Sequence, residues 1–106
     1  MRRNEPTRNA ELTTLRADID RVNGRLVALL QQRARIVARI ARLKRRAGIA
    51  IADPRREQAM LRTALAAVGT GLPRASLARI LRLVFAESRR FAVRTATSRR
   101  APGRPA

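Results

Sequence analysis

Four polar residues fall on the otherwise apolar stripes of predicted helices. They are Arg33, Lys44, Glu57 and Ser88. A charge on an apolar face is costly unless it is paired or meets a ligand. The four residues offer two cations, one carboxylate and one hydroxyl, but no nucleophile with a base and no cluster of metal ligands. We therefore expect them to bind a small dianion that carries a hydroxyl group.

The spacing of Arg33 and Lys44 places both cations on one face of the same predicted helix. Arg33 and Lys44 are eleven residues apart, so at about 100° per residue they share one face to within about 20° and lie roughly 16 Å apart along the axis. Arg16 lies seventeen residues before Arg33 and points about 100° away from it. Arg16 could therefore join the same pocket only across an oligomer interface.

Each of these residues also has a purely structural interpretation. Arg33 could set the register of a helix pair, and Lys44 could interact with the dipole at a helix C-terminus. Asp53, which precedes Pro54, could be a helix N-cap. Glu57 could form an ion pair with a neighbouring arginine, and Ser88 could donate to a backbone carbonyl of its own helix.

A long first helix is predicted by a heptad pattern over about residues 11–46, with Gly48 as its stop signal. Such a helix would be about 54 Å long, whereas a compact chain of this size has a radius of gyration near 13 Å. The rest of the chain could not cover it, so we infer an oligomer in which two copies of the helix pack together. The heptad positions are Leu12, Leu15, Ile19, Val22, Leu26, Leu29, Arg33, Ile36, Ile40 and Leu43.

Two shorter helices are predicted after the first, and no segment shows convincing strand alternation. The second begins at Asp53-Pro54 and ends before the loop at 69–73. The third runs from about Arg74 to the low nineties. The predicted fold is all-α, with three helices per subunit. The apolar stripes are Met60, Leu61, Ala64, Leu65 and Val68 in the second helix, and Leu77, Ile80, Leu81, Val84, Phe85 and Ser88 in the third.

The composition excludes several classes of site. The 106 residues fit one domain, which we place at 10–94, between a loose arm at 1–9 and a disordered basic tail at 95–106. Cysteine and histidine are absent, which rules out disulfides, thiolate metal sites and a Ser-His-Asp triad. With two phenylalanines and no other aromatic residue, stacking on single-stranded nucleic acid is excluded.

The net charge of +18 invites a nucleic-acid interpretation. However, Lys44 is the one lysine among 25 basic residues, so much of the charge reflects an arginine-biased composition. We expect non-specific electrostatic binding at most, and no specific nucleic-acid site. The sequence shows neither a membrane-spanning apolar run nor a signal peptide, so we expect a cytoplasmic protein that does not act at a membrane.

Five motifs in order resemble the AroQ-type, all-α chorismate mutases over about residues 12–92. They are L-R-A-D-I-D at 15–20, L-V-A-L-L-Q-Q-R at 26–33, I-A-R-L-K at 40–44, I-A-D-P-R-R-E at 51–57 and F-A-E-S at 85–88. The resemblance implies an intertwined helical homodimer with two active sites. It also implies an isomerase of aromatic amino acid biosynthesis that converts chorismate to prephenate without a cofactor or a metal.

The resemblance implies roles for the cations. Arg16 resembles the arginine that reaches into the partner subunit's site and binds a substrate carboxylate, and Arg33 resembles the arginine that binds a carboxylate in its own subunit. Lys44 resembles the lysine that contacts the ether oxygen and a carboxylate. In the implied mechanism, Lys44, Arg33 and Glu57 are the catalytic residues.

The remaining implied contacts concern the substrate's hydroxyl and ring carboxylate. Asp53 matches the position that contacts the ring hydroxyl through its backbone, and Glu57 resembles the glutamate that accepts a hydrogen bond from that hydroxyl. Ser88 matches the serine near the ring carboxylate. Four residues later, Ala92 replaces the usual Gln or Glu on the ether oxygen, and such a loss can lower a rate by roughly 10²–10³. Arg89 and Arg94 lie nearby in sequence and could compensate, but the helical phase favours neither as a substitute donor.

Two further functions fit the same residues. One is an isochorismate pyruvate lyase, which relatives of this fold perform with nearly the same pocket chemistry. The other is a weakly active chorismate-mutase-like domain that needs or regulates a shikimate-pathway partner enzyme, as Ala92 and the basic tail suggest. Product analysis with each substrate, and activity with and without a partner enzyme, would separate these alternatives.

Overall fold

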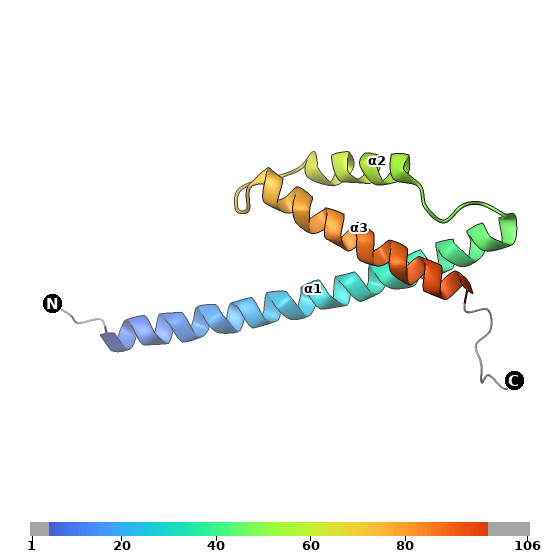
Figure 1. The fold of residues 1–106 in the computed structure, drawn as a ribbon. Helices are drawn as coiled ribbons and strands as arrows, with labels where there is room; N and C mark the ends of the chain where they lie inside the picture. Colours follow the sequence, from blue (N-terminus) through green and yellow to red (C-terminus); the bar gives the residue numbers. More distant parts are fainter. Residues whose placement is uncertain (1–4, 98–106) are drawn as a thin grey trace, which may run out of the picture. The chain divides into compact units, whose positions relative to one another are not determined.

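The computed structural model describes residues 5–97, which form three α-helices and no strand (Figure 1). The helices are α1 (Glu5–Ala47), α2 (Pro54–Leu65) and α3 (Arg74–Thr97). The all-α prediction is confirmed. With 43 residues, α1 is about 65 Å long at 1.5 Å per residue. Within residues 5–97, no helix combines the length and the apolarity needed to cross a bilayer.

The start of α1 and the end of α3 both lie beyond the positions that the sequence predicts. α1 begins at Glu5, so residues 5–9, which we expected in a loose arm, form its first turns. Pro6 is tolerated there because the first N–H groups of a helix need no intrahelical partner, and Glu5 complements the helix dipole. α3 extends to Thr97, three residues into the expected tail. Residues 98–106 of that tail lie outside the described part of the chain.

A glycine ends α1, as the sequence predicts. Gly48 has φ +71°, a left-handed conformation that glycine adopts without steric cost. The Gly48 N–H donates to the Arg45 carbonyl at 3.2 Å, and the Ile49 N–H donates to the Lys44 carbonyl at 2.8 Å. These two bonds form a Schellman motif. The motif turns the chain out of α1 into the loop that leads to α2.

The described residues divide into two compact units, one ending at Arg33 and the other beginning at Ala34. The first unit contains α1 up to Arg33, and its six apolar heptad side chains are 45% to 60% exposed. We call these side chains the N-terminal seam. In a single chain the seam is therefore uncovered. It consists of Leu12, Leu15, Ile19, Val22, Leu26 and Leu29.

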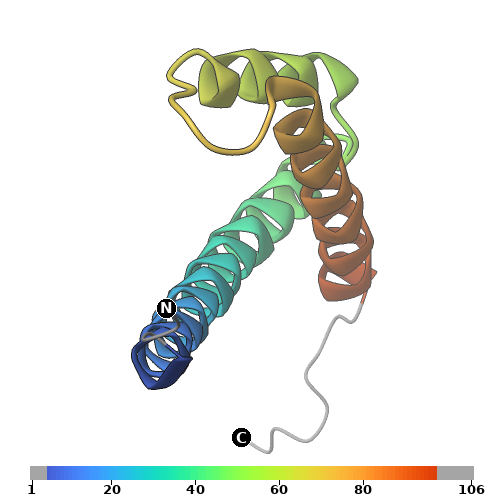
Figure 2. The ribbon, with the colours of Figure 1, turned by 90° about the vertical axis from the view of Figure 1, so that its left-hand side faces the viewer.

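The second unit has a core of small side chains. Ala41, Ala92 and Ala96 are buried together, with Val37 and Ile51 packed against them. We call these three alanines the alanine cluster. It lies where α3 packs beside the final turns of α1 (Figure 1 and Figure 2). Because alanine has no side chain beyond Cβ, the two helices can approach closely at this point.

The stripe predicted for α3 is only partly buried. Phe85 is 6% exposed, as expected, but Ile80 is 50% exposed. α2 and α3 pack on each other and run in roughly opposite directions (Figure 1). Arg74 joins their adjacent ends by donating from Nη1 to the Leu65 carbonyl at 2.7 Å. The start of α2 therefore lies beside the second half of α3, where the polar residues gather.

Candidate active site

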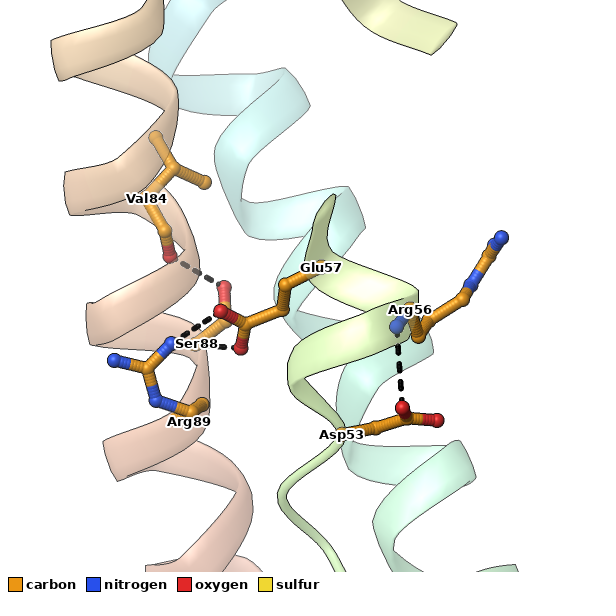
Figure 3. Close-up of polar contacts among 6 residues, drawn as sticks. All are labelled: Asp53, Arg56, Glu57, Val84, Ser88 and Arg89. Atoms are coloured by element: carbon orange, nitrogen blue, oxygen red, sulfur yellow. Dashed lines mark hydrogen bonds and ion pairs between the residues drawn. The ribbon is translucent and has the colours of Figure 1, made fainter. Parts of the chain in front are cut away.

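An ion pair between α2 and α3 forms the centre of the candidate site. Arg89 donates from Nη1 to both carboxylate oxygens of Glu57, each at 2.6 Å (Figure 3). The Glu57 side chain is 24% exposed and that of Arg89 is 45% exposed. The Asp18–Arg21 and Glu87–Arg90 ion pairs each join residues three apart on one helix. The Glu57–Arg89 pair instead joins two different helices, α2 and α3.

Asp53 sets the start of α2 and thereby the position of Glu57. Its Oδ1 accepts a hydrogen bond from the Arg56 N–H at 3.1 Å (Figure 3). Pro54 occupies the first helical position. The Asp53 carbonyl also accepts from the Glu57 N–H at 3.1 Å. The N-cap prediction is confirmed. The cap places Glu57 in the first turn of α2, on the side that α3 covers.

Ser88 is half-buried and immediately precedes Arg89. Its Oγ donates to the Val84 carbonyl at 2.7 Å (Figure 3). This is the bond expected from the structural interpretation of a serine within a helix. It holds the hydroxyl close to its own helix, beside the Glu57–Arg89 pair.

Lys44 lies half-buried in the last turn of α1. Its Nζ donates to the Ile51 carbonyl at 3.4 Å, a long hydrogen bond that uses one of the three donors of an ammonium group. The position is also one where a helix dipole favours a cation. Lys44 therefore connects the end of α1 to the loop that leads to Asp53.

Arg16 and Arg33 belong to the first unit, whereas the other four predicted site residues belong to the second. The Arg16 residue is exposed, and Arg33 is half-buried and engaged in interactions. Their roles as carboxylate-binding residues remain predictions. The second unit brings Glu57 to Arg89, with Ser88 next to Arg89 in sequence.

Ala92 is a core residue in this chain. It is 5% exposed and belongs to the alanine cluster. At the position where the sequence resemblance implies a Gln or Glu, this protein has a methyl group buried in the alanine cluster.

Arg89 is the residue that sequence reasoning missed. Glu57 forms the expected ion pair, but its partner is 32 positions away instead of being a neighbouring arginine. One signal could have indicated such a partner. The chain has seven acidic residues and 25 basic ones. Because arginines are so numerous, a carboxylate on the inward-facing stripe of one helix can be expected to meet an arginine of the helix packed against it.

Comparison with known proteins identifies the family. The family model described as chorismate mutase type II matches residues 15–93. The T-protein of Enterobacter agglomerans is 40% identical over 80 residues, and the match covers 74% of this chain and 21% of that protein. The chain thus spans about a fifth of the length of this curated relative.

Two solved structures of chorismate mutase from Thermus thermophilus are similar to the fold. Form II matches with a TM-score of 0.77 and 31% identity, covering 79% of this chain and 96% of that one. Form I matches with a TM-score of 0.72 and 32% identity, covering 74% and 98%. From the family match and these structural similarities, we conclude that the chain belongs to the chorismate mutase type II family.

Proposed function

We propose that this protein is a chorismate mutase, which rearranges chorismate to prephenate. The observation that carries the proposal is the similarity to the Thermus thermophilus chorismate mutase, of which the match covers 96% at a TM-score of 0.77. The family match over residues 15–93 supports it independently.

The chemistry suits a chain without histidine and cysteine. In this rearrangement one ether C–O bond breaks and one C–C bond forms within a single molecule. The step needs no external acid, base or nucleophile. Catalysis then consists of holding the reactive chair conformer and placing positive charge where negative charge develops on the ether oxygen.

In the proposed mechanism, Lys44 stabilises the ether oxygen. Its ammonium has three donors, and its long bond to the Ile51 carbonyl is easily exchanged for a stronger one to an anionic oxygen. Arg33 binds a substrate carboxylate in its own subunit. Arg16 of the second copy binds the other carboxylate.

Glu57 accepts a hydrogen bond from the ring hydroxyl in this mechanism. Its carboxylate is held between α2 and α3 by Arg89, which restricts its orientation before substrate binds. Asp53 contributes by fixing the first turn of α2. Ser88, which precedes Arg89 in the sequence, contacts the ring carboxylate in this mechanism.

We propose a homodimer as the active form. The N-terminal seam is exposed over six heptad positions in the single chain. Burial of such a seam against its own copy removes apolar surface from water at roughly 25 cal/mol per Å². The same pairing would bring Arg16 of one subunit to the site of the other.

The test is chorismate consumption by the purified chain, with prephenate identified by chromatography. Replacing Lys44→Ala should lower kcat/KM by roughly 10²–10³-fold, as for loss of a preorganised electrostatic donor. Arg45→Ala is the matched control, because Arg45 lies in the same last turn but is exposed. The control should retain parental activity.

Two results would contradict the proposal at different levels. No chorismate consumption by the unaltered chain would contradict the mutase function, and pyruvate release from isochorismate in a parallel reaction would favour the lyase. Parental kcat/KM in the Lys44→Ala variant would contradict the role of Lys44 alone.

The packing of Ala92 favours a second candidate, a mutase domain of low intrinsic activity that a shikimate-pathway partner enzyme activates. A methyl group packed in the alanine cluster supplies no hydrogen bond to the ether oxygen. If this candidate is correct, kcat/KM should increase by at least about tenfold when the partner is added, since one recovered charge-assisted hydrogen bond has that size. Unchanged activity with every partner tested would contradict it.

A further inference from the structure

We propose that Arg89 is a positioning residue: it orients the Glu57 carboxylate toward the ring hydroxyl and thereby makes the enzyme selective for a hydroxyl-bearing substrate. The inference rests on the proposed function, and it assigns a role to a residue that the sequence did not indicate. Its basis is the cross-helix pair in which one guanidinium nitrogen contacts both oxygens of Glu57 (Figure 3).

The hydrogen-bond geometry leaves Glu57 able to accept a further bond. An ionised carboxylate has about four lone-pair sites, two on each oxygen. Arg89 Nη1 lies 2.6 Å from both oxygens, so it occupies the side of the carboxylate between them. The outer lone pair of each oxygen remains directed away from Arg89. A hydroxyl donor approaching from the outer side would meet a carboxylate whose orientation is already fixed.

Both partners are anchored on regular structure. Glu57 follows the Asp53 cap within the first turn of α2, and Arg89 follows Ser88, whose hydroxyl is bonded to its own helix. The carboxylate is therefore held from both ends, by its backbone and by a guanidinium on the facing helix. Such preorganisation reduces the ordering cost when a substrate binds.

Burial distinguishes this pair from the Asp18–Arg21 and Glu87–Arg90 ion pairs. Its carboxylate side chain is 24% exposed, against 45% for Asp18 and 60% for Glu87. A less exposed pair is less screened by water and salt. The Glu57–Arg89 pair therefore has the geometry to hold one orientation, whereas the pairs on the surface of a single helix do not.

The charge of Arg89 has a second consequence for a dianionic substrate. An uncompensated Glu57 would repel the substrate's carboxylates, because like charges at close range are unfavourable. Arg89 neutralises this repulsion through its ion pair with Glu57. Because the guanidinium of Arg89 is already paired with Glu57, it is less available to bind a substrate carboxylate. The carboxylates are then left to bind Arg16, Arg33 or Lys44.

A double-mutant cycle on kcat/KM tests the inference. Arg89→Met should lower kcat/KM for chorismate by about tenfold, the size of one lost charge-assisted hydrogen bond. In a Glu57→Gln background the same substitution should change kcat/KM by less than about twofold, because the residue that Arg89 orients has been altered. Arg89→Lys should recover part of the loss, since one nitrogen makes the native contact.

Arg90→Met is the matched control. It removes the same charge from the next residue, which pairs with Glu87 on the exposed side of α3 at 69% side-chain exposure. It should leave kcat/KM within about twofold of the parent, as expected for an exposed ion pair. Circular dichroism and thermal unfolding of all variants show whether each one is folded.

A substrate analogue in which hydrogen replaces the ring hydroxyl gives the second readout. If Arg89 acts through Glu57 on that hydroxyl, Arg89→Met should lower kcat/KM for the analogue by a smaller factor than for chorismate, because the analogue keeps the carboxylates that an uncompensated Glu57 repels but lacks the hydroxyl. Equal losses with both substrates, additive effects in the cycle, or a higher kcat/KM in Arg89→Met would each overturn the inference while leaving the mutase function intact. Failure of the unaltered chain to consume chorismate would instead contradict the proposed function.

Discussion

The two units of the chain differ in how much of their apolar surface is buried within a single copy. Within residues 5–33, the apolar heptad side chains are exposed, and the Asp18–Arg21 ion pair joins neighbouring turns of one helix. Within residues 34–97, α3 packs on α1 through the alanine cluster, and Glu57 binds Arg89 across two helices. The second unit therefore has a core of its own, whereas residues 5–33 contribute no side chain to a buried core within a single copy.

Side-chain size on two stripes of α1 explains this difference. The heptad seam continues past the unit boundary, and Ile36, Ile40 and Leu43 are 51%, 46% and 59% exposed. α3 instead packs on a second stripe that contains Val37 and Ala41. The large aliphatic side chains of the heptad seam can interdigitate with those of a second long helix. The alanine on the other stripe allows α3 of the same chain to approach α1 closely.

The largest expected effect comes from placing a charge in the N-terminal seam. Ile19 is 58% exposed in the single chain and would be buried in a dimer. Ile19→Asp would bury an uncompensated carboxylate at a cost of roughly 3–5 kcal/mol per copy. The dimer dissociation constant should then increase by about 10⁴-fold or more. Size-exclusion chromatography with light scattering measures this change directly.

The matched control for the seam is Ala17→Asp. Two residues before Ile19, Ala17 lies on the opposite side of the helix at about 100° per residue, and it is exposed. It introduces the same charge and should leave the dimer intact. Dissociation by both variants, or by neither, would contradict the assignment of the seam as the dimer interface.

An intermediate effect is expected from overfilling the core of the second unit. Ala92→Gln would force a long polar side chain into a position that is 5% exposed in the alanine cluster. Overpacking costs typically about 1–3 kcal/mol, and an unpaired buried amide adds to it. Urea unfolding at a fixed protein concentration should show the loss of stability.

Val93→Gln provides the control for this substitution. The Val93 side chain is 50% exposed, so the same replacement should change the free energy of unfolding by about 0.5 kcal/mol or less. Higher activity and unchanged stability in Ala92→Gln would mean that position 92 faces the substrate, which would contradict its place in the alanine cluster.

Local signals made much of the fold predictable. The heptad repeat indicated α1, Asp53-Pro54 indicated the start of α2, and Gly48 marked the end of α1. Each signal acts within a few residues, through side-chain periodicity, capping or a backbone conformation. The cap at Asp53 and the bond from Ser88 to its own helix were predictable for the same reason.

Contacts between distant residues were harder to predict. The partner of Glu57 depends on how α2 lies against α3, which no local pattern fixes. The stripe of small residues on α1 was missed because alanine is common on exposed and buried helix faces alike. For the same reason, Ala92 was interpreted as the loss of a polar group and not as part of a core.

The smallest expected effects come from one substitution made in each unit, Gly24→Ala and Gly48→Ala. Neither added Cβ would have a heavy atom within 4 Å, so the effects are conformational and not steric. Gly48 has φ +71°, where alanine costs about 1–2 kcal/mol, so its replacement should lower the thermal midpoint. Gly24 lies inside α1, where alanine is favoured by about 0.5–1 kcal/mol, so its replacement should raise the thermal midpoint.

The opposite signs of the two shifts in thermal midpoint test whether the end of α1 depends on the left-handed conformation of Gly48. A raised or unchanged thermal midpoint in Gly48→Ala would mean that the left-handed residue of the Schellman motif contributes nothing to stability.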